Sequence, residues 1–135
     1  MKRCMRLAGF SLIELMVVIT ILSILALIGM PSYQQYIKRA RFIEVITAVE
    51  PYKIAVAIAL QSGINIADLQ NGTHGIPDAL TSTKNIASIV VENGTIIATA
   101  TALANSATYI LKPLAEGSRW QISGTCLKQG LCSDA

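Results

Sequence analysis

The strongest constraint on this chain is an apolar run from Phe10 to Met30 that contains a single charged residue, Glu14. As a helix rising about 1.5 Å per residue, the run would span roughly 30 Å, the thickness of a bilayer's hydrocarbon core. It is longer than the apolar stretch of a secretory signal, and no small-residue cleavage site follows it. The run therefore predicts a single membrane-spanning helix.

Charge is distributed unevenly around this run. Lys2, Arg3 and Arg6 precede it without any acidic residue, whereas residues 10–135 hold eight basic and eight acidic side chains. By the positive-inside rule, the basic head stays in the cytoplasm and the chain after the run lies across the membrane. A formally neutral body gives no indication of a surface that binds nucleic acid.

Glu14 needs a physical explanation in such a run. A carboxylate at the centre of a membrane helix costs about 2.5–3.5 kcal/mol, and less near the interface. Because Glu14 lies near the cytoplasmic end, its side chain could reach toward the lipid headgroups. A cationic partner would explain its presence better.

The residues Gly9-Phe10-Ser11-Leu12-Ile13-Glu14, behind a short basic leader, resemble the processing site of type IV prepilins. The resemblance continues through residues 15–18 and on to Pro31. It implies that a membrane peptidase cleaves after Gly9 and methylates the new amino group of Phe10. Three parts are then expected: a leader at 1–9, an apolar assembly helix at 10–30 and a globular head at 31–135.

This resemblance supplies a partner for Glu14. Cleavage would create a positive amine on Phe10, one helical turn from Glu14. In a filament of axially displaced subunits, Glu14 of one chain would meet the Phe10 amine of its neighbour. An unpaired buried charge costs several kcal/mol, so the pair would fix the register between subunits. Glu14 is therefore expected to be an assembly residue, with reach toward the headgroups as the alternative.

A helical pattern continues beyond the apolar run. Apolar residues recur at spacings of three and four among charged ones, which predicts an amphipathic half: Ile46, Val49, Val56 and Leu60. Gly63 is a natural stop, so one helix is expected over roughly residues 10–62. Pro31 and Pro51 each remove a helical hydrogen bond and should bend it. The resemblance implies that helicity before Pro31 can be lost in assembled pili, although Ser23 stands where the family often has glycine.

The rest of the chain predicts a small sheet. Residues 63–85 are rich in turn-forming residues and read as a long loop that holds the single histidine, His74. Four strands with alternating polarity follow, the first two flanking the hairpin signal Asn93-Gly94: residues 88–92, 95–102, 109–112 (ended by Pro113) and 119–125. The expected fold class is α+β, with the helix's C-terminal half packed on a four-stranded antiparallel sheet, as in pilins.

The chain has three cysteines. Cys4 is expected to be a free cytoplasmic thiol, while Cys126 and Cys132 lie beyond the membrane, where a disulfide is expected to close a short loop. By position this loop resembles the disulfide-bounded loop of type IVa pilins. A C-x5-C spacing is not that of a zinc site, so neither a metal nor a cofactor is expected.

No catalytic constellation or phosphate-binding loop stands out, which disfavours an enzyme. The resemblance implies a structural subunit of type IV pili that serve adhesion, twitching motility and sometimes DNA uptake. Its expected partners are copies of itself, the prepilin peptidase/N-methyltransferase, the inner-membrane assembly machinery and, before assembly, membrane lipid. Its location would be the inner membrane first and an extracellular pilus afterwards. The alternatives are a type II secretion pseudopilin, a minor pilin and a membrane-tethered module that never polymerises.

Overall fold

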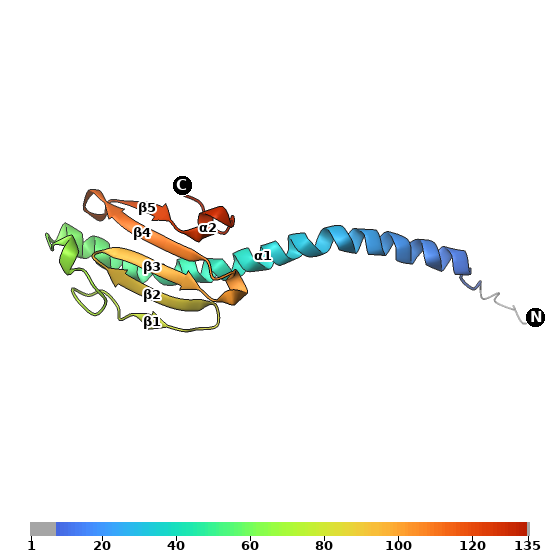
Figure 1. Cartoon of the computed structure of the whole chain (residues 1–135), viewed down its shortest axis with the longest axis horizontal. Helices are drawn as coiled ribbons and strands as arrows, with labels where there is room; N and C mark the ends of the chain where they lie inside the picture. Colours follow the sequence, from blue (N-terminus) through green and yellow to red (C-terminus); the bar gives the residue numbers. More distant parts are fainter. Residues whose placement is uncertain (1–7, 135) are drawn as a thin grey trace, which may run out of the picture. The chain divides into compact units, whose positions relative to one another are not determined.

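A computed structural model of the chain describes residues 8–134, so Lys2, Arg3, Arg6 and Cys4 lie outside the described residues (Figure 1). The chain divides into two compact units, one up to Gln35 and one from Tyr36 onward. The helix α1 (Leu12–Gln61) belongs to both, and the second unit adds a five-stranded sheet, three short 3₁₀ turns and the short helix α2 (Thr125–Lys128).

Helix α1 begins where a serine caps it. The backbone carbonyl of Ser11 accepts from the amide of Leu15 (3.2 Å), and its hydroxyl accepts from the amide of Glu14 (3.3 Å). Serine is among the preferred N-cap residues because its oxygen satisfies an amide that lacks a helical partner. The helix therefore starts at Leu12, two residues later than predicted, and continues through both Pro31 and Pro51 to Gln61. The bends expected at the two prolines stay predictions.

The first part of α1 is apolar on every side. Large apolar side chains between Leu12 and Met30 expose 45% to 78% of their surface, and this helix is long and apolar enough to cross a membrane. Two hydroxyl side chains in this stretch bond within their own helix, Thr20 to the carbonyl of Met16 (2.8 Å) and Ser23 to that of Ile19 (2.7 Å).

In the second unit, α1 buries one stripe of side chains at spacings of three and four. Its members are Phe42, Val45, Val49, Tyr52, Val56 and Ala59. The sequence predicted Val49 and Val56 correctly, but Ile46 and Leu60 are only partly buried at the margin of the core. On a helix with 3.6 residues per turn, several overlapping stripes of side chains at spacings of three and four can be drawn. Which stripe lies at the centre of the core is therefore decided only by the surface on which the helix packs.

The sheet has the order β1-β2-β3-β4-β5, with every neighbouring pair antiparallel. Its strands are β1 (Leu80–Thr81), β2 (Ile86–Glu92), β3 (Thr95–Ala100), β4 (Thr108–Leu114) and β5 (Arg119–Ser123). The four predicted strands are present, but the prediction of only four was wrong. β1 lies inside the segment that was predicted to be a loop. A strand of two residues shows no alternation, so only its pairing with Ser88 and Ile89 reveals it.

The C-terminal ends predicted for three of the strands were also wrong. β4 continues through Pro113, which pairs with Trp120, because the pairing of β3 with β4 ends at Leu111. Beyond that residue β4 has a neighbour on one side only, a position where proline is tolerated. β3 and β5 end two residues early, since a 3₁₀ turn starts at Ala102 and α2 starts at Thr125.

The stripe on α1 and one face of the sheet form a single core. Ile96, Ala98 and Ala100 on β3 are almost completely buried, and the ring of Phe42 meets that of Tyr109 edge to face, with 6.2 Å between the ring centroids. The Tyr52 hydroxyl donates to the carbonyl of Asp78 (2.8 Å) and ties the loop before β1 to the helix. Burial, with the nearby Asp78 carboxylate, raises the pKa of Tyr52, so its hydroxyl stays a donor at neutral pH.

Candidate assembly site and disulfide loop

The residues predicted for processing lie just before α1. Gly9, Phe10 and Ser11 are outside the helix, and the side chain of Phe10 is 82% exposed. No described atom lies within 4 Å of the position that a side chain at Gly9 would occupy. Phe10 and Glu14 line the same open hollow, together with Ala8 and Gly9. This segment therefore presents a non-helical, uncovered backbone next to the Glu14 side chain.

Glu14 is the third residue of α1 and follows the capping serine by three positions. Ser-x-x-Glu is the sequence of a capping box, in which the glutamate returns a hydrogen bond to the amide of the cap residue. Among residues 8–134 only one hydrogen bond of this box is present, the one that the Ser11 hydroxyl accepts from the amide of Glu14. The Glu14 carboxylate makes neither a hydrogen bond nor a salt bridge with any of these residues. The capping role of Ser11 was not predicted, although the Ser-x-x-Glu spacing signals it.

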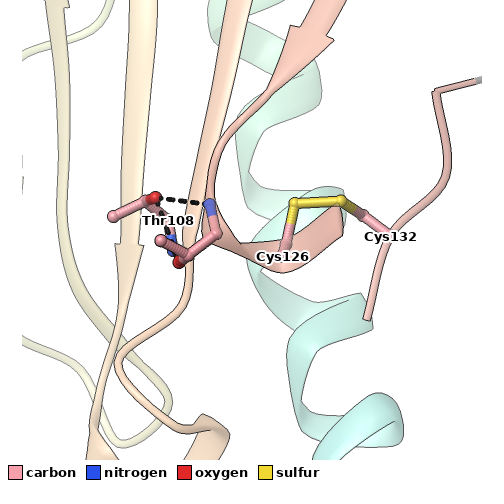
Figure 2. The surroundings of a disulfide bond; sticks show 4 residues. Thr108, Cys126 and Cys132 are labelled. Carbon is pink, nitrogen blue, oxygen red and sulfur yellow. Dashed lines mark hydrogen bonds between the residues drawn. A yellow bond between two sulfur atoms is a disulfide. The ribbon is translucent and has the colours of Figure 1, made fainter. Parts of the chain in front are cut away.

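The second feature is the disulfide between Cys126 and Cys132, whose Cα atoms are 5.3 Å apart (Figure 2). The loop between the two cysteines packs against the core. Cys126 and Leu131 are buried in the core, and the amide of Leu131 donates to the carbonyl of Cys126 (2.9 Å). The disulfide therefore holds a short surface loop against the body of the second unit.

A pair of threonines fixes where this loop begins. The amide of Thr108 donates to the hydroxyl of Thr125 (2.9 Å), and the amide of Thr125 donates to the hydroxyl of Thr108 (3.0 Å) (Figure 2). The start of β4 is thereby joined to the start of α2. Gly124 precedes this contact with φ of 121°, and a Cβ there would lie 2.3 Å from the carbonyl oxygen of Thr108. Only glycine fits at this position.

Gly124→Ala is expected to destabilise the second unit by at least about 2 kcal/mol, because residues forced into such backbone regions cost about 1–3 kcal/mol before any clash is added. Chemical denaturation of the full chain in detergent, followed by the fluorescence of Trp120, measures this. Gly130→Ala is the matched control, since Gly130 also has positive φ (66°) but open space around it. Equal losses in the two variants would contradict a steric role for Gly124.

Comparisons with known proteins cover most of the chain. The family model described as "Prokaryotic N-terminal methylation motif" matches residues 4–30. A second model, described as "Pilin (bacterial filament)", matches residues 38–132, which include the second half of α1, the sheet and the disulfide loop. Together they cover both units of the structure.

Several curated relatives are similar to this chain. Prepilin peptidase-dependent protein D of Escherichia coli (strain K12) is 36% identical over 106 residues, which are 78% of this chain and 71% of the relative. Type IV pilus subunit protein TapA of Aeromonas hydrophila is 40% identical over 72 residues (53% of this chain, 51% of TapA). Type IV major pilin protein PilE of Neisseria gonorrhoeae is 41% identical over 93 residues (67% and 54%).

The chain thus spans about half the length of TapA and PilE, and more of the relative from Escherichia coli. The α+β arrangement, the long apolar helix and the disulfide agree with these matches. Since the pilin model covers well over half of its residues, this chain belongs to the type IV pilin family, whose members are structural filament subunits and not enzymes.

Proposed function

We propose that this chain is a prepilin that is cleaved after Gly9, methylated on the amine of Phe10 and polymerised through residues 10–30 into a type IV pilus. Residues 1–9 then act as a leader, 10–30 as the assembly helix and 31–135 as the head. The observation that carries the proposal is the exposed apolar half of α1, which begins with a carboxylate that has no partner among residues 8–134.

The apolar half requires a cover. Each Å² of apolar surface left in water forgoes about 25 cal/mol, and every large apolar side chain from Leu12 to Met30 is at least 45% exposed. A bilayer can cover all sides of this helix, as can a bundle of identical helices. We infer that lipid covers it in the inner membrane and that other copies cover it in the extracellular filament.

Processing would complete the site around Glu14. The non-helical backbone at Gly9 and Phe10 supports access by the prepilin peptidase/N-methyltransferase, because a peptidase needs a bond that is not held in a helix. Cleavage turns the Phe10 nitrogen into a cation beside the hollow that Glu14 lines. Methylation keeps that charge, so the Glu14–Phe10 pair can still form between neighbouring subunits. The name of the relative from Escherichia coli, which depends on prepilin peptidase, supports such processing.

We propose that the filaments serve adhesion and twitching motility, with DNA uptake in addition where the assembly machinery supports it. The alternatives from the sequence, a type II secretion pseudopilin or a minor pilin, share the same N-terminal segment. The disulfide at the end of the head favours a pilin, since major pseudopilins usually hold that end with calcium. A tethered module that never polymerises would leave the apolar half in lipid permanently.

Mass spectrometry of sheared surface filaments tests the proposal. We expect a chain that starts at methylated Phe10 and has Cys126 and Cys132 oxidised. The same measurement on the membrane fraction of cells without prepilin peptidase should show an uncleaved chain. Filaments built from chains that retain Met1 or Lys2 would refute the processing step.

A further inference from the structure

Five basic residues gather at one end of the second unit. The antiparallel order brings the β1–β2 loop, the β3–β4 loop and the segment after β5 to the same end of the sheet (Figure 1). α1 passes this end near residue 41, where the Arg41 guanidinium donates to the carbonyl of Leu103 (3.5 Å). We call these residues the basic collar: Lys38, Arg39, Arg41, Lys84 and Lys128.

Hydrogen bonds hold the remaining parts of this end together. Asn85 donates to the carboxylate of Glu44 on α1, and the Thr101 hydroxyl donates to the carbonyl of Lys84 (3.0 Å). The Thr108–Thr125 pair joins the start of β4 to α2, which carries Lys128. The collar is therefore built from segments distant in sequence that hydrogen bonds connect.

The collar has a clear excess of positive charge. Among residues 8–134, Glu44 is the acidic residue that a hydrogen bond ties to this end, through Asn85 of the β1–β2 loop. Among residues 8–134, the one salt bridge joins Lys53 to Glu50 and involves no member of the collar. Arg39, Lys84 and Lys128 are exposed, and Lys38 and Arg41 are partly exposed. The formal neutrality of the body thus conceals a local positive surface.

The opposite end of the sheet carries the reverse charge. There the amide of Gly94 donates to the carbonyl of Leu69 (3.0 Å), and Gly117 packs against Ala57 near the end of α1. The charged residues beside these turns are mostly acidic: Asp68, Glu92, Glu116 and, as the one basic residue, Arg119. Two negatively charged partners therefore fit the collar: a lipid surface that contains anionic headgroups, or the acidic end of a second copy of the chain.

The order of residues along α1 decides in favour of lipid. Lys38 follows Met30 by eight residues in the sequence. Tyr33 and Tyr36 lie between them with exposed fractions of 65% and 71%. Aromatic rings favour the membrane interface, and long cationic side chains reach toward headgroup phosphates, so an apolar span followed by tyrosines and then basic residues suits a helix that leaves a bilayer.

We propose that the basic collar binds the headgroups of anionic phospholipids in the bilayer that holds residues 10–30 before assembly. This inference rests on the proposed membrane insertion. Tethering by the apolar helix keeps the headgroups close to the collar at high effective concentration. Long lysine and arginine side chains reach the phosphates while the head stays in water. Such contacts hold the head at the membrane surface until the subunit is extracted into a filament.

Vesicles containing the full chain test this inference. Phosphatidylcholine vesicles receive a trace of spin-labelled phosphatidylglycerol or spin-labelled phosphatidylcholine, and electron spin resonance gives the fraction of each label immobilised by the protein. We expect the native chain to prefer phosphatidylglycerol about threefold or more. The preference should fall toward one in 1 M salt, where charges are screened beyond about 3 Å.

Matched variants locate the contact. Lys38→Gln/Arg39→Gln removes one lysine and one arginine from the collar and should lose most of the preference. Lys112→Gln/Arg119→Gln removes the same two residue types from exposed positions on β4 and β5 and should keep it. Lys38→Arg/Arg39→Lys should also keep it. Thermal unfolding, read by circular dichroism, shows that each head is folded.

Three results would overturn the inference: no preference in the native chain, equal losses in both neutralised pairs, or a preference that is insensitive to salt. A collar variant that keeps its lipid preference but forms no filaments would instead assign the collar to a second copy. The vesicle measurement requires insertion but no filaments, so a failure of polymerisation leaves it interpretable. A chain that does not float with the vesicles would refute membrane insertion, and with it the collar's lipid partner.

Discussion

Glu14→Ala is expected to lower the yield of sheared filaments at least tenfold while the chain still accumulates in the membrane. Removing one member of a buried ion pair costs about 3–5 kcal/mol because the other charge stays buried, and about 1.4 kcal/mol already corresponds to a factor of ten. The alanine also removes the one ionised side chain of the apolar run, so insertion itself becomes easier. Immunoblots of sheared and membrane fractions measure both quantities.

Glu14→Gln separates the assembly role from a role in the capping box, whose Ser-x-x-Glu sequence the chain carries. Glutamine can complete a capping box as glutamate does, but it carries no charge. If Glu14 serves mainly to cap α1, Glu14→Gln filaments should be as abundant as those of the native chain. If it pairs with the Phe10 amine of a neighbour, Glu14→Gln should lose filaments as Glu14→Ala does.

Thr20→Ala is the matched control for Glu14→Ala. Thr20 is also a polar residue of the apolar half, but its hydroxyl bonds to the carbonyl of Met16 in its own helix. Its loss leaves no buried group without a partner and should leave filament yield unchanged. Unchanged filament yield in Glu14→Ala would instead show that Glu14 only reaches toward the headgroups.

Phe42→Ala is expected to destabilise the head by about 3–5 kcal/mol, because it removes a buried aromatic side chain and leaves a cavity. Phe42 is completely buried on α1 and meets Tyr109 of β4, so it joins the helix to the sheet. Denaturant titration of the full chain in detergent, followed by the fluorescence of Trp120, reports on the head because Trp120 lies on β5 beside the core.

Ile43→Ala is the control for Phe42→Ala. Ile43 is the next residue of the same helix but is 56% exposed, so its truncation should change the free energy of unfolding by no more than about 0.5 kcal/mol. Equal midpoints for Phe42→Ala and the native chain would show that α1 does not contribute to the core as described.

The long helix and the longer strands were predictable because each has a regular pattern of apolar residues. The 3.6-residue period marks α1, and alternation marks β2 to β5. Asn93-Gly94 predicted its hairpin because both residues adopt positive φ there, 48° and 71°, which these two residues tolerate best. The candidate site was predictable in part: Gly9, Phe10 and Glu14 came from a motif, while the cap made by Ser11 was missed.

What the sequence determined by itself was therefore the long helix with its apolar half, four of the five strands and the cysteine pair, since periodicity, composition and spacing are properties of the chain alone. Only the tertiary structure decided which stripe of α1 is buried, that Leu80 and Thr81 form a fifth strand and that β4 continues through Pro113. It also decided that basic residues far apart in the chain meet in one collar. These outcomes depend on which surfaces and strand edges face each other, and that is fixed only when the helix packs on the sheet.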